Sequence, residues 1–224
     1  MSKQEQNKPE ELEQVEQVLS KSEAFIEKYQ KQLLLAVAIV VLSVLSVLAF
    51  KNFYIDSRET QAQNEMAKAQ ALFAVDSFKV ALDGKGEVVG FKEIASEYSI
   101  TSSGNLAEAY AGICYYKLGQ YDNAIKYLSQ FDGEDNYFTT SIIGLIGDAY
   151  VEMGKNKDAV DYFVKAADKE NEVLSAVFLK KAGKVYEALG KPEKALEVYT
   201  QIKDNYPKSS EASDIEKYIA RVQK

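Results

Sequence analysis

The sequence contains no histidine and no tryptophan, and its only cysteine is Cys114. Without histidine, the chain has no imidazole to act as a general base, to complete a catalytic triad or to bind a metal ion. A single cysteine forms neither an internal disulfide bond nor a cysteine-based metal site. These absences exclude the histidine-dependent enzymes, and we expect no cofactor and no metal site.

Basic residues are also too few to give the chain a positive charge. It contains 27 lysine and arginine residues against 34 aspartate and glutamate residues, which gives a net charge of −7. Nucleic-acid binding depends on basic patches that neutralise phosphate groups. The sequence has no such patch, so we expect no nucleic-acid partner.

The longest uncharged stretch lies at residues 33–50 and reads LLLAVAIVVLSVLSVLAF, without proline or glycine. As a helix it measures roughly 27 Å, close to the ~30 Å hydrocarbon thickness of a bilayer. Tyr29, Phe53 and Tyr54 lie where an aromatic belt occurs at a membrane interface. We predict a single uncleaved transmembrane anchor at residues 33–50, with a cleaved signal peptide or a buried core helix as alternatives.

Residues 1–32 form a polar tail that carries a heptad stripe. The a and d positions are Leu12, Val15, Leu19, Ser22, Ile26, Tyr29 and Leu33. This spacing predicts either an amphipathic helix on the membrane surface or a short coiled coil that forms a homo-oligomer or docks on a partner's helix. Lysine and arginine counts do not orient the anchor, because the flanking segments on its two sides contain equal numbers.

Residues 51–104 follow the anchor as a linker helix and a degenerate repeat. The absence of proline and glycine from 52–82 predicts one long helix, ended by the glycine-rich sequence that begins at Asp83. A second helix is predicted over about 87–98. The segment that contains it aligns with a later part of the chain and places Phe91 on Tyr199.

Residues 105–208 contain three copies of one pattern, at intervals of 35 and 36 residues. Each copy has a glycine, a tyrosine three residues later, a second glycine that ends the first helix, an alanine in the second helix and a large apolar residue four positions further. These are Gly112, Tyr115, Gly119, Ala124 and Leu128; Gly147, Tyr150, Gly154, Ala159 and Phe163; and Gly183, Tyr186, Gly190, Ala195 and Tyr199.

The repeated residue types predict pairs of helices that stack into a solenoid, because no pair buries its apolar face alone. We expect the first glycine to let the first helix approach the alanine of the second, while the large residues fill the gap to the next pair. The second glycine should adopt the left-handed conformation that ends a helix. At residues 209–224, a single apolar stripe predicts a C-terminal capping helix.

The pattern resembles the tetratricopeptide repeat (TPR) over about residues 105–208, and Pro207 matches the closing proline of that family. The tryptophan typical of the first helix is absent, with Glu108, Ile143 and Leu179 in its place. The resemblance implies an all-α fold, in which a single N-terminal transmembrane helix precedes a right-handed superhelix of antiparallel helix pairs.

The resemblance to TPR proteins also implies a groove for proteins or peptides on the concave face, lined by first-helix positions that do not pack. By register these are Tyr116, Lys117, Gly144, Asp148, Val151, Lys180, Lys184 and Glu187. Lys180 and Lys184 lie one turn apart and are placed to pair with an acidic peptide end. The asparagines of the carboxylate clamp found in some TPR modules are missing, and the mixed charges indicate a weak, adaptable site.

No catalytic pattern stands out in the sequence. It lacks a phosphate-binding glycine loop, and the acidic turn at 132–135 lacks the alternation and closing glutamate of a calcium loop. We interpret Cys114 as an inert core thiol. The chain is therefore predicted not to be an enzyme. The alternative from another class is a hydrolase that uses two carboxylates, which would lie about 5–10 Å apart in a pocket.

The layout of tail, single span and TPR body resembles the bacterial family of membrane-anchored ancillary subunits of the SecYEG translocon. That resemblance implies a cytoplasmic tail, periplasmic repeats and a role in protein secretion at the inner membrane, next to the translocon and periplasmic chaperones. A scaffold for envelope or outer-membrane complex assembly or for cell division is the alternative.

Overall fold

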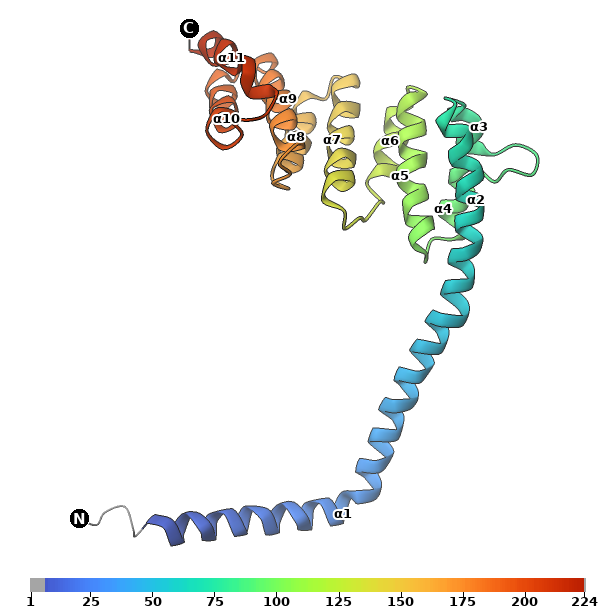
Figure 1. Ribbon diagram of the computed structural model, residues 1–224, viewed down its shortest axis with the longest axis vertical. Helices are drawn as coiled ribbons and strands as arrows, with labels where there is room; N and C mark the ends of the chain where they lie inside the picture. The colour runs from blue at the N-terminus through green and yellow to red at the C-terminus, as the bar shows by residue number, and fades with distance from the viewer. Residues whose placement is uncertain (1–6, 224) are drawn as a thin grey trace. The chain divides into compact units, whose positions relative to one another are not determined.

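The computed structural model describes the backbone of residues 7–223 and the side chains of residues 28–223. The chain divides into two compact units after Asp56. The first unit contains α1 (Asn7–Ala49) and the π-helical segment η1 (Phe50–Ile55), drawn in blue in Figure 1. The predicted heptad positions from Leu12 to Ile26 have side chains outside the described residues.

One helix among the described residues is long and apolar enough to cross a membrane, and it contains residues 33–50. None of its apolar window is buried, and Val47 is 67% exposed. The core-helix alternative is therefore wrong, whereas a membrane anchor and a signal sequence both fit this finding. The hydroxyls of Ser43 and Ser46 donate to the carbonyls of Ile39 and Leu42 at 2.8 Å, which satisfies them within the helix.

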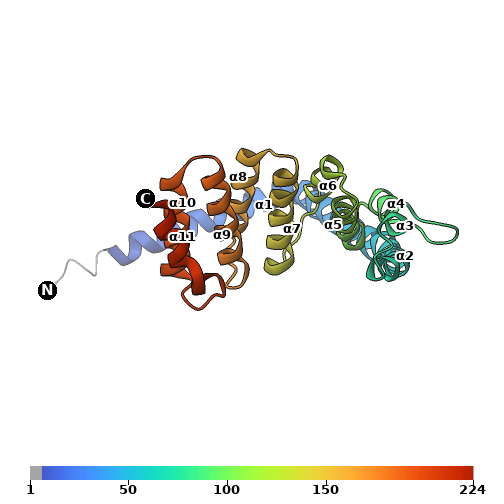
Figure 2. The same cartoon turned by 90° about the horizontal axis from the view of Figure 1, so that it is seen from above.

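The second unit is an all-α, TPR-like repeat array. Its elements are α2 (Asp56–Ala74), α3 (Phe78–Asp83), α4 (Phe91–Glu97), α5 (Ser102–Lys117), α6 (Tyr121–Leu128), α7 (Asn136–Glu152), α8 (Asn156–Ala167), α9 (Leu174–Ala188), α10 (Pro192–Asn205), η2 (Glu211–Asp214) and α11 (Ile215–Val222). The three predicted pairs are α5/α6, α7/α8 and α9/α10. Figure 2 shows the first helices α5, α7 and α9 in one layer and the second helices α6, α8 and α10 in the other.

The prediction of one helix over 52–82 is wrong, because α2 ends at Ala74 and α3 begins at Phe78. Asp76 interrupts the helix with a left-handed φ of 57°, a conformation that aspartate tolerates better than most residues. Neither proline nor glycine marks this break in the sequence. The helix predicted over 87–98 begins only at Phe91, after a turn closed by a bridge from Lys85 to Val88.

The three glycines that end the first helices are left-handed, as predicted. Gly119, Gly154 and Gly190 have φ angles of 72°, 71° and 67°. In each case the next residue's amide donates back to the tyrosine of the same repeat, for example from Gln120 to the carbonyl of Tyr115 at 2.9 Å. These bonds close the first helix and turn the chain toward the second.

The first glycine of each repeat seats the large apolar side chain of the second helix. A Cβ atom on Gly147 would lie 2.7 Å from the ring of Phe163, and one on Gly183 would lie 2.2 Å from that of Tyr199. Gly112 holds Leu128 in the same way. The prediction that alanine lies across this contact is wrong. The observed partner is the larger residue, because only glycine leaves room for it against the helix backbone.

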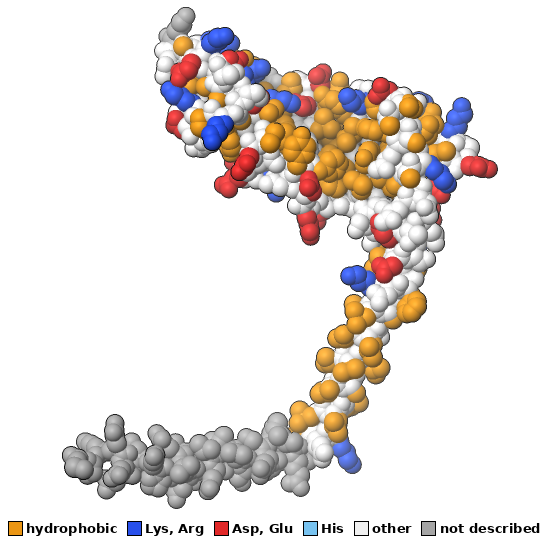
Figure 3. Space-filling model, viewed as in Figure 1, with side chains coloured by type: hydrophobic (Ala, Val, Ile, Leu, Met, Phe, Trp, Pro, Cys, Tyr) orange, Lys and Arg blue, Asp and Glu red, His pale blue; other side chains and the backbone are white. Residues whose placement is uncertain are grey.

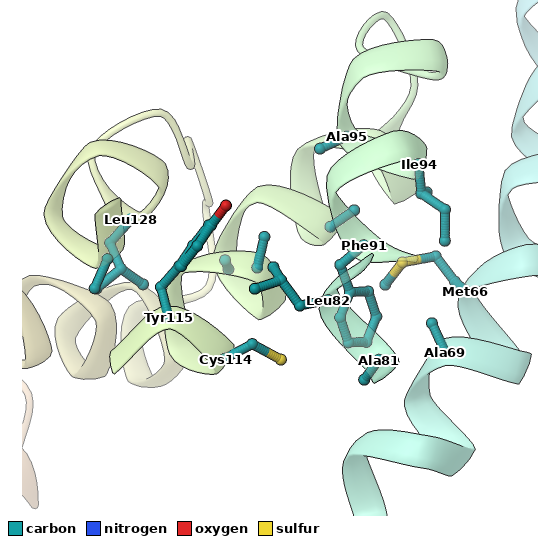
Figure 4. Close-up of a cluster of buried hydrophobic side chains, with 14 of the residues drawn as sticks. Met66, Ala69, Ala81, Leu82, Phe91, Ile94, Ala95, Cys114, Tyr115 and Leu128 are labelled. Carbon is teal, nitrogen blue, oxygen red and sulfur yellow. The ribbon is translucent and has the colours of Figure 1, made fainter. Parts of the chain in front are cut away.

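The core of the body consists of two hydrophobic clusters that both include residues of α7, and the first cluster includes the degenerate repeat. Phe91 and Ile94 of α4 are fully buried, as are the residues that align with them, Tyr199 and Ile202. Figure 4 shows Phe91 surrounded by Met66, Leu82 and Ala81, from α2 and α3. The segment α2–α4 therefore continues the hydrophobic core of the three regular repeats.

The C-terminal cap has the predicted apolar stripe, but its first turn is a 3-10 helix, η2. The Ser209 hydroxyl accepts a hydrogen bond from the Ala212 amide at 3.2 Å and so helps to start this turn. Ile215 and Ile219 of α11 are buried against the last pair. Because one face of α11 is apolar and the other is polar, the helix closes the array.

The close contact between Gly147 and Phe163 predicts the effect of Gly147→Ala. In an exposed helix this change stabilises by about 0.5–1 kcal/mol. Here the new methyl group meets Phe163, so we expect the free energy of unfolding to fall by about 1–3 kcal/mol in urea denaturation. The double variant Gly147→Ala/Phe163→Leu should lose less than the sum of its two single variants. An increase in stability for Gly147→Ala would contradict the close contact between Gly147 and Phe163.

Candidate functional site

The predicted groove residues of the last repeat are engaged by the C-terminal cap. The Lys180 ammonium donates to the Asp214 carboxylate, and it also lies 4.9 Å from the centre of the Tyr218 ring. Lys184 lies over the same ring at 5.8 Å and stays exposed. The cap therefore already occupies Lys180, which is not free to form the two-lysine site for a peptide terminus that its spacing predicted.

Glu187 forms the densest polar contact with the cap. Its carboxylate accepts two hydrogen bonds from the Arg221 guanidinium, at 2.6 and 2.7 Å, and one from the Tyr199 hydroxyl at 2.6 Å. Burial alone would raise the pKa of Glu187, but the bonds from Arg221 and Tyr199 outweigh it and hold the pKa below its ordinary value. Glu187 thus has a structural role in attaching α11.

In the middle repeat, Asp148 pairs with the next repeat. Its carboxylate accepts from the Lys181 ammonium at 2.7 and 2.8 Å. Gly144 is buried, since a Cβ there would lie 1.9 Å from the ring of Phe178, and it cannot line a groove. Val151 is 38% exposed and is the apolar groove residue that this repeat offers.

In the first repeat, Tyr116 is half-buried with its ring 5.6 Å from that of Tyr121. Burial raises the pKa of Tyr116, and the charges of Asp148 and Glu152 on α7 raise it further. The structure therefore brings Tyr116 near Asp148, across the contact between α5 and α7. Lys117 is exposed in the last turn of α5.

Sequence reasoning missed an apolar patch on the layer of first helices, which we call the first-helix face. Figure 3 shows it in orange over α5 and α7. Leu106, Tyr110 and Ile113 follow one another on α5, and Leu145 comes from α7; all four are only partly buried. The Tyr110 ring packs against Phe73 and Phe91 of the core. The spacing of four and three residues on α5 was the available signal. The register argument had favoured charged positions instead.

Among the hollows on the described part of the body are three with volumes of about 350, 470 and 310 Å³. The first is lined by Glu59 and Ser103, whose amide and hydroxyl donate to Glu59 at 3.0 and 2.7 Å. The last is lined by Asp168 and Glu170, both exposed on the loop between α8 and α9. Among the described residues, no group of three side chains is placed to hold a metal ion.

Cys114 is fully buried in α5. Burial raises the pKa of its thiol to about 12, so the thiol stays protonated near neutral pH. A protonated, enclosed thiol is a poor nucleophile, which agrees with the interpretation of Cys114 as a core residue.

Comparison with known proteins identifies the repeats. A model described as the tetratricopeptide repeat matches residues 110–132 and 179–209, and a second model with the same description matches 140–168. A TPR repeat-containing protein of Methanocaldococcus jannaschii is 28% identical over 141 residues, which cover 62% of this chain and 22% of that protein. The chain thus spans about a fifth of the length of this relative.

Two solved structures, from a Podosopora anserina protein with nearly identical TPR-like repeats and from its Q17M variant, cover 75% of this chain and 84% of theirs. Each has 14% identity and a TM-score of 0.46. The sequence models match segments of all three regular repeats, so the chain contains tetratricopeptide repeats and one long apolar N-terminal helix. Repeats of this kind indicate protein partners.

The attachment of α11 predicts a pH-dependent effect of Glu187→Gln. A carboxyl whose pKa is lowered on folding stabilises the protein above its ordinary value, here 4.5, and this stability is lost as the pH falls through the folded pKa. We expect the variant to lose about 0.5–1 kcal/mol near neutral pH, measured by urea denaturation, and the difference from wild type to shrink at low pH. A difference that grows at low pH would contradict this role.

Proposed function

We propose that the protein is a non-enzymatic, membrane-anchored adaptor that binds proteins or peptides on its first-helix face. The observation that carries this proposal is the apolar patch over α5 and α7, on tetratricopeptide repeats, which suggest protein partners. Solvent-facing apolar patches of this kind mark sites of protein association. No observation on the described residues favours the carboxylate hydrolase.

The proposed anchor is residues 33–50. Its side chains are uncovered in the described structure, with Leu34 and Leu42 each 63% exposed, which is unfavourable in water and favourable in a bilayer. Anchoring raises the effective concentration of the body near other membrane proteins, so a weak surface suffices for binding. This explains how a site without deep pockets serves an adaptor.

The chemistry of the first-helix face indicates what it binds. This face contains Leu106, Ile113 and Leu145, and the helices that carry it, α5 and α7, end at the oppositely charged residues Lys117 and Glu152. A bound segment therefore gains its free energy from aliphatic or aromatic side chains, and charge fixes its register. The proposed partner is a polypeptide segment with few charges.

The cellular setting that we propose rests on the order of tail, span and repeats. This order supports a single-pass protein of the bacterial inner membrane with a periplasmic body, which works next to the secretion translocon and periplasmic chaperones. The alternative is a scaffold for envelope or outer-membrane complex assembly or for cell division. The two differ in the proteins that contact the first-helix face.

A photo-crosslinking residue at Val151 of the full chain tests the partner in living cells. We expect adducts with translocon subunits or periplasmic chaperones, because Val151 is an exposed apolar position on α7, one of the two helices that carry the first-helix face. The matched control is Asp161, exposed on α8 in the opposite layer, which should give few of these adducts. Adducts with outer-membrane assembly or division proteins would favour the scaffold. The same adducts from both positions would contradict binding on this face.

Cysteine labelling tests the anchor and its orientation. Cys114 is buried and gives little background, so new cysteines report their own exposure. In spheroplasts we expect a membrane-impermeant maleimide to label Lys157→Cys, and to label Lys8→Cys only after lysis. The reverse pattern would place the body in the cytoplasm. A mature chain that lacks residue 8 would show that the apolar segment is a cleaved signal.

A further inference from the structure

The edge of the body where each second helix turns into the next first helix differs from the opposite edge. We call it the loop edge; it consists of residues 98–101, 129–137, 168–173 and 205–210, and its first three loops lie along the lower side of the body in Figure 1. The helix α2 begins at the same edge, because the Arg58 guanidinium donates to the carbonyl of Glu97.

Exposed apolar side chains recur along the loop edge. Ile100, Tyr137 and Val173 are 52%, 56% and 62% exposed, and each lies at a successive junction between repeats. A single exposed apolar residue is ordinary, but here one recurs close to each of three junctions. Tyr137 and Val173 lie ten residues before the first glycine of their repeats, and Ile100 lies twelve residues before Gly112. The stacking of the repeats sets the spacing of these residues along the loop edge.

Acidic side chains flank these apolar residues. They are Asp132, Glu134, Asp135, Asp168, Glu170 and Glu172. All are exposed, and none forms a salt bridge with another described residue. Figure 3 shows acidic side chains along the lower side of the body. The basic residues of these loops are Lys169 and Lys208, both exposed, so the loop edge combines apolar contacts with an excess of negative charge.

Hydrogen bonds between repeats hold the loops in place. The Asn105 side chain donates to the carbonyl of Asp132 at 2.6 Å and accepts from its amide at 2.9 Å. One repeat further, the Asn136 side chain donates to the carbonyl of Lys169 at 3.3 Å. Loops fixed in this way lose little conformational entropy when a partner binds.

Three hollows of the body have lining residues in or next to these loops. The two near its C-terminal end, of about 470 and 310 Å³, share Tyr206 and lie between the loop at 168–173 and the loop at 205–210. The hollow of about 350 Å³ lies between α2 and the start of α5 at Ser102. Shallow hollows beside exposed apolar residues can receive side chains of a partner.

We propose that the loop edge docks a basic, amphipathic polypeptide segment. Its lysine and arginine side chains pair with the exposed acids, while its apolar side chains contact Ile100, Tyr137 and Val173 and enter the hollows. This surface is separate from the first-helix face and adds a second partner to the proposed adaptor. Anionic lipid headgroups are the less favourable occupant, because the acids of the loops repel them.

Binding of a labelled helical peptide, with lysine on one face and leucine on the other, tests the proposal. The full chain is held in nanodiscs of zwitterionic lipid, and affinity is read from fluorescence anisotropy. We expect the variant Asp132→Asn/Glu134→Gln/Glu170→Gln to weaken binding about tenfold and to flatten its salt dependence. The variant Ile100→Ser/Tyr137→Ser/Val173→Ser should weaken binding by a similar factor.

The matched control removes three acids from the opposite edge, at the first turns of the second helices. The variant Asp122→Asn/Asp158→Asn/Glu193→Gln should bind as the wild type does. Equal losses in this control, or equal binding of a peptide with glutamate in place of lysine, would overturn the proposal. Circular dichroism establishes whether each variant is folded. If the apolar variant unfolds, the variant of the exposed acids still tests the contribution of charge.

Two further measurements distinguish docking on the loop edge from binding on the first-helix face and from lipid binding. Ile113→Ser alters the first-helix face and should leave binding of the basic peptide unchanged, so either surface can fail alone. Vesicles that contain anionic phosphatidylglycerol should not bind the nanodisc-held protein more than zwitterionic vesicles do. Binding to the anionic vesicles that disappears in the Ile100→Ser/Tyr137→Ser/Val173→Ser variant would assign the loop edge to lipid instead.

Discussion

The body depends on one repeated contact, in which a large side chain of each second helix packs directly against the first glycine of its repeat. We call this contact the glycine seat. At Gly147 the ring of Phe163 lies where a Cβ would be, and the same ring stacks on Phe178 of the next pair at 6.2 Å. The Phe163 side chain therefore packs α7 against α8 and also packs this pair against the next one. Because the contact recurs in each repeat, it sets the layering of the helices and, with it, the two surfaces that we assign to binding.

Much of the body could be predicted because repetition makes local signals reliable. The left-handed turn at Gly154 and the buried position of Phe91 followed from aligned residues, without knowledge of the tertiary structure. The break at Asp76 could not be predicted, since a single aspartate in a left-handed conformation has no strong signature. The partner of Gly147 was also misjudged, because sequence spacing places residues on faces but does not show which side chain fills a gap.

The candidate groove was predicted less well than the fold, for a physical reason. Register identifies the outward face of a first helix, but the same face is the one that the next first helix approaches. Lys180 and Glu187 therefore contact η2 and α11, and Asp148 pairs with Lys181. Charged residues at these positions join repeats, and the surface left open is apolar. The proposed function accordingly relies on shape and apolar contact, with membrane anchoring compensating for modest affinity.

Native-state hydrogen exchange of the full chain in nanodiscs tests the central claim directly. If the glycine seats join each pair and each stack, the amides of α7 and α8 should exchange through one shared opening reaction with similar free energies. Introduction of alanine at Gly147 should increase the amide exchange rates of α7 and α8 by similar factors. The exchange rates of the distant α4 should change less. Independent exchange of α7 and α8, with α8 opening alone, would contradict the claim that this contact holds the array together.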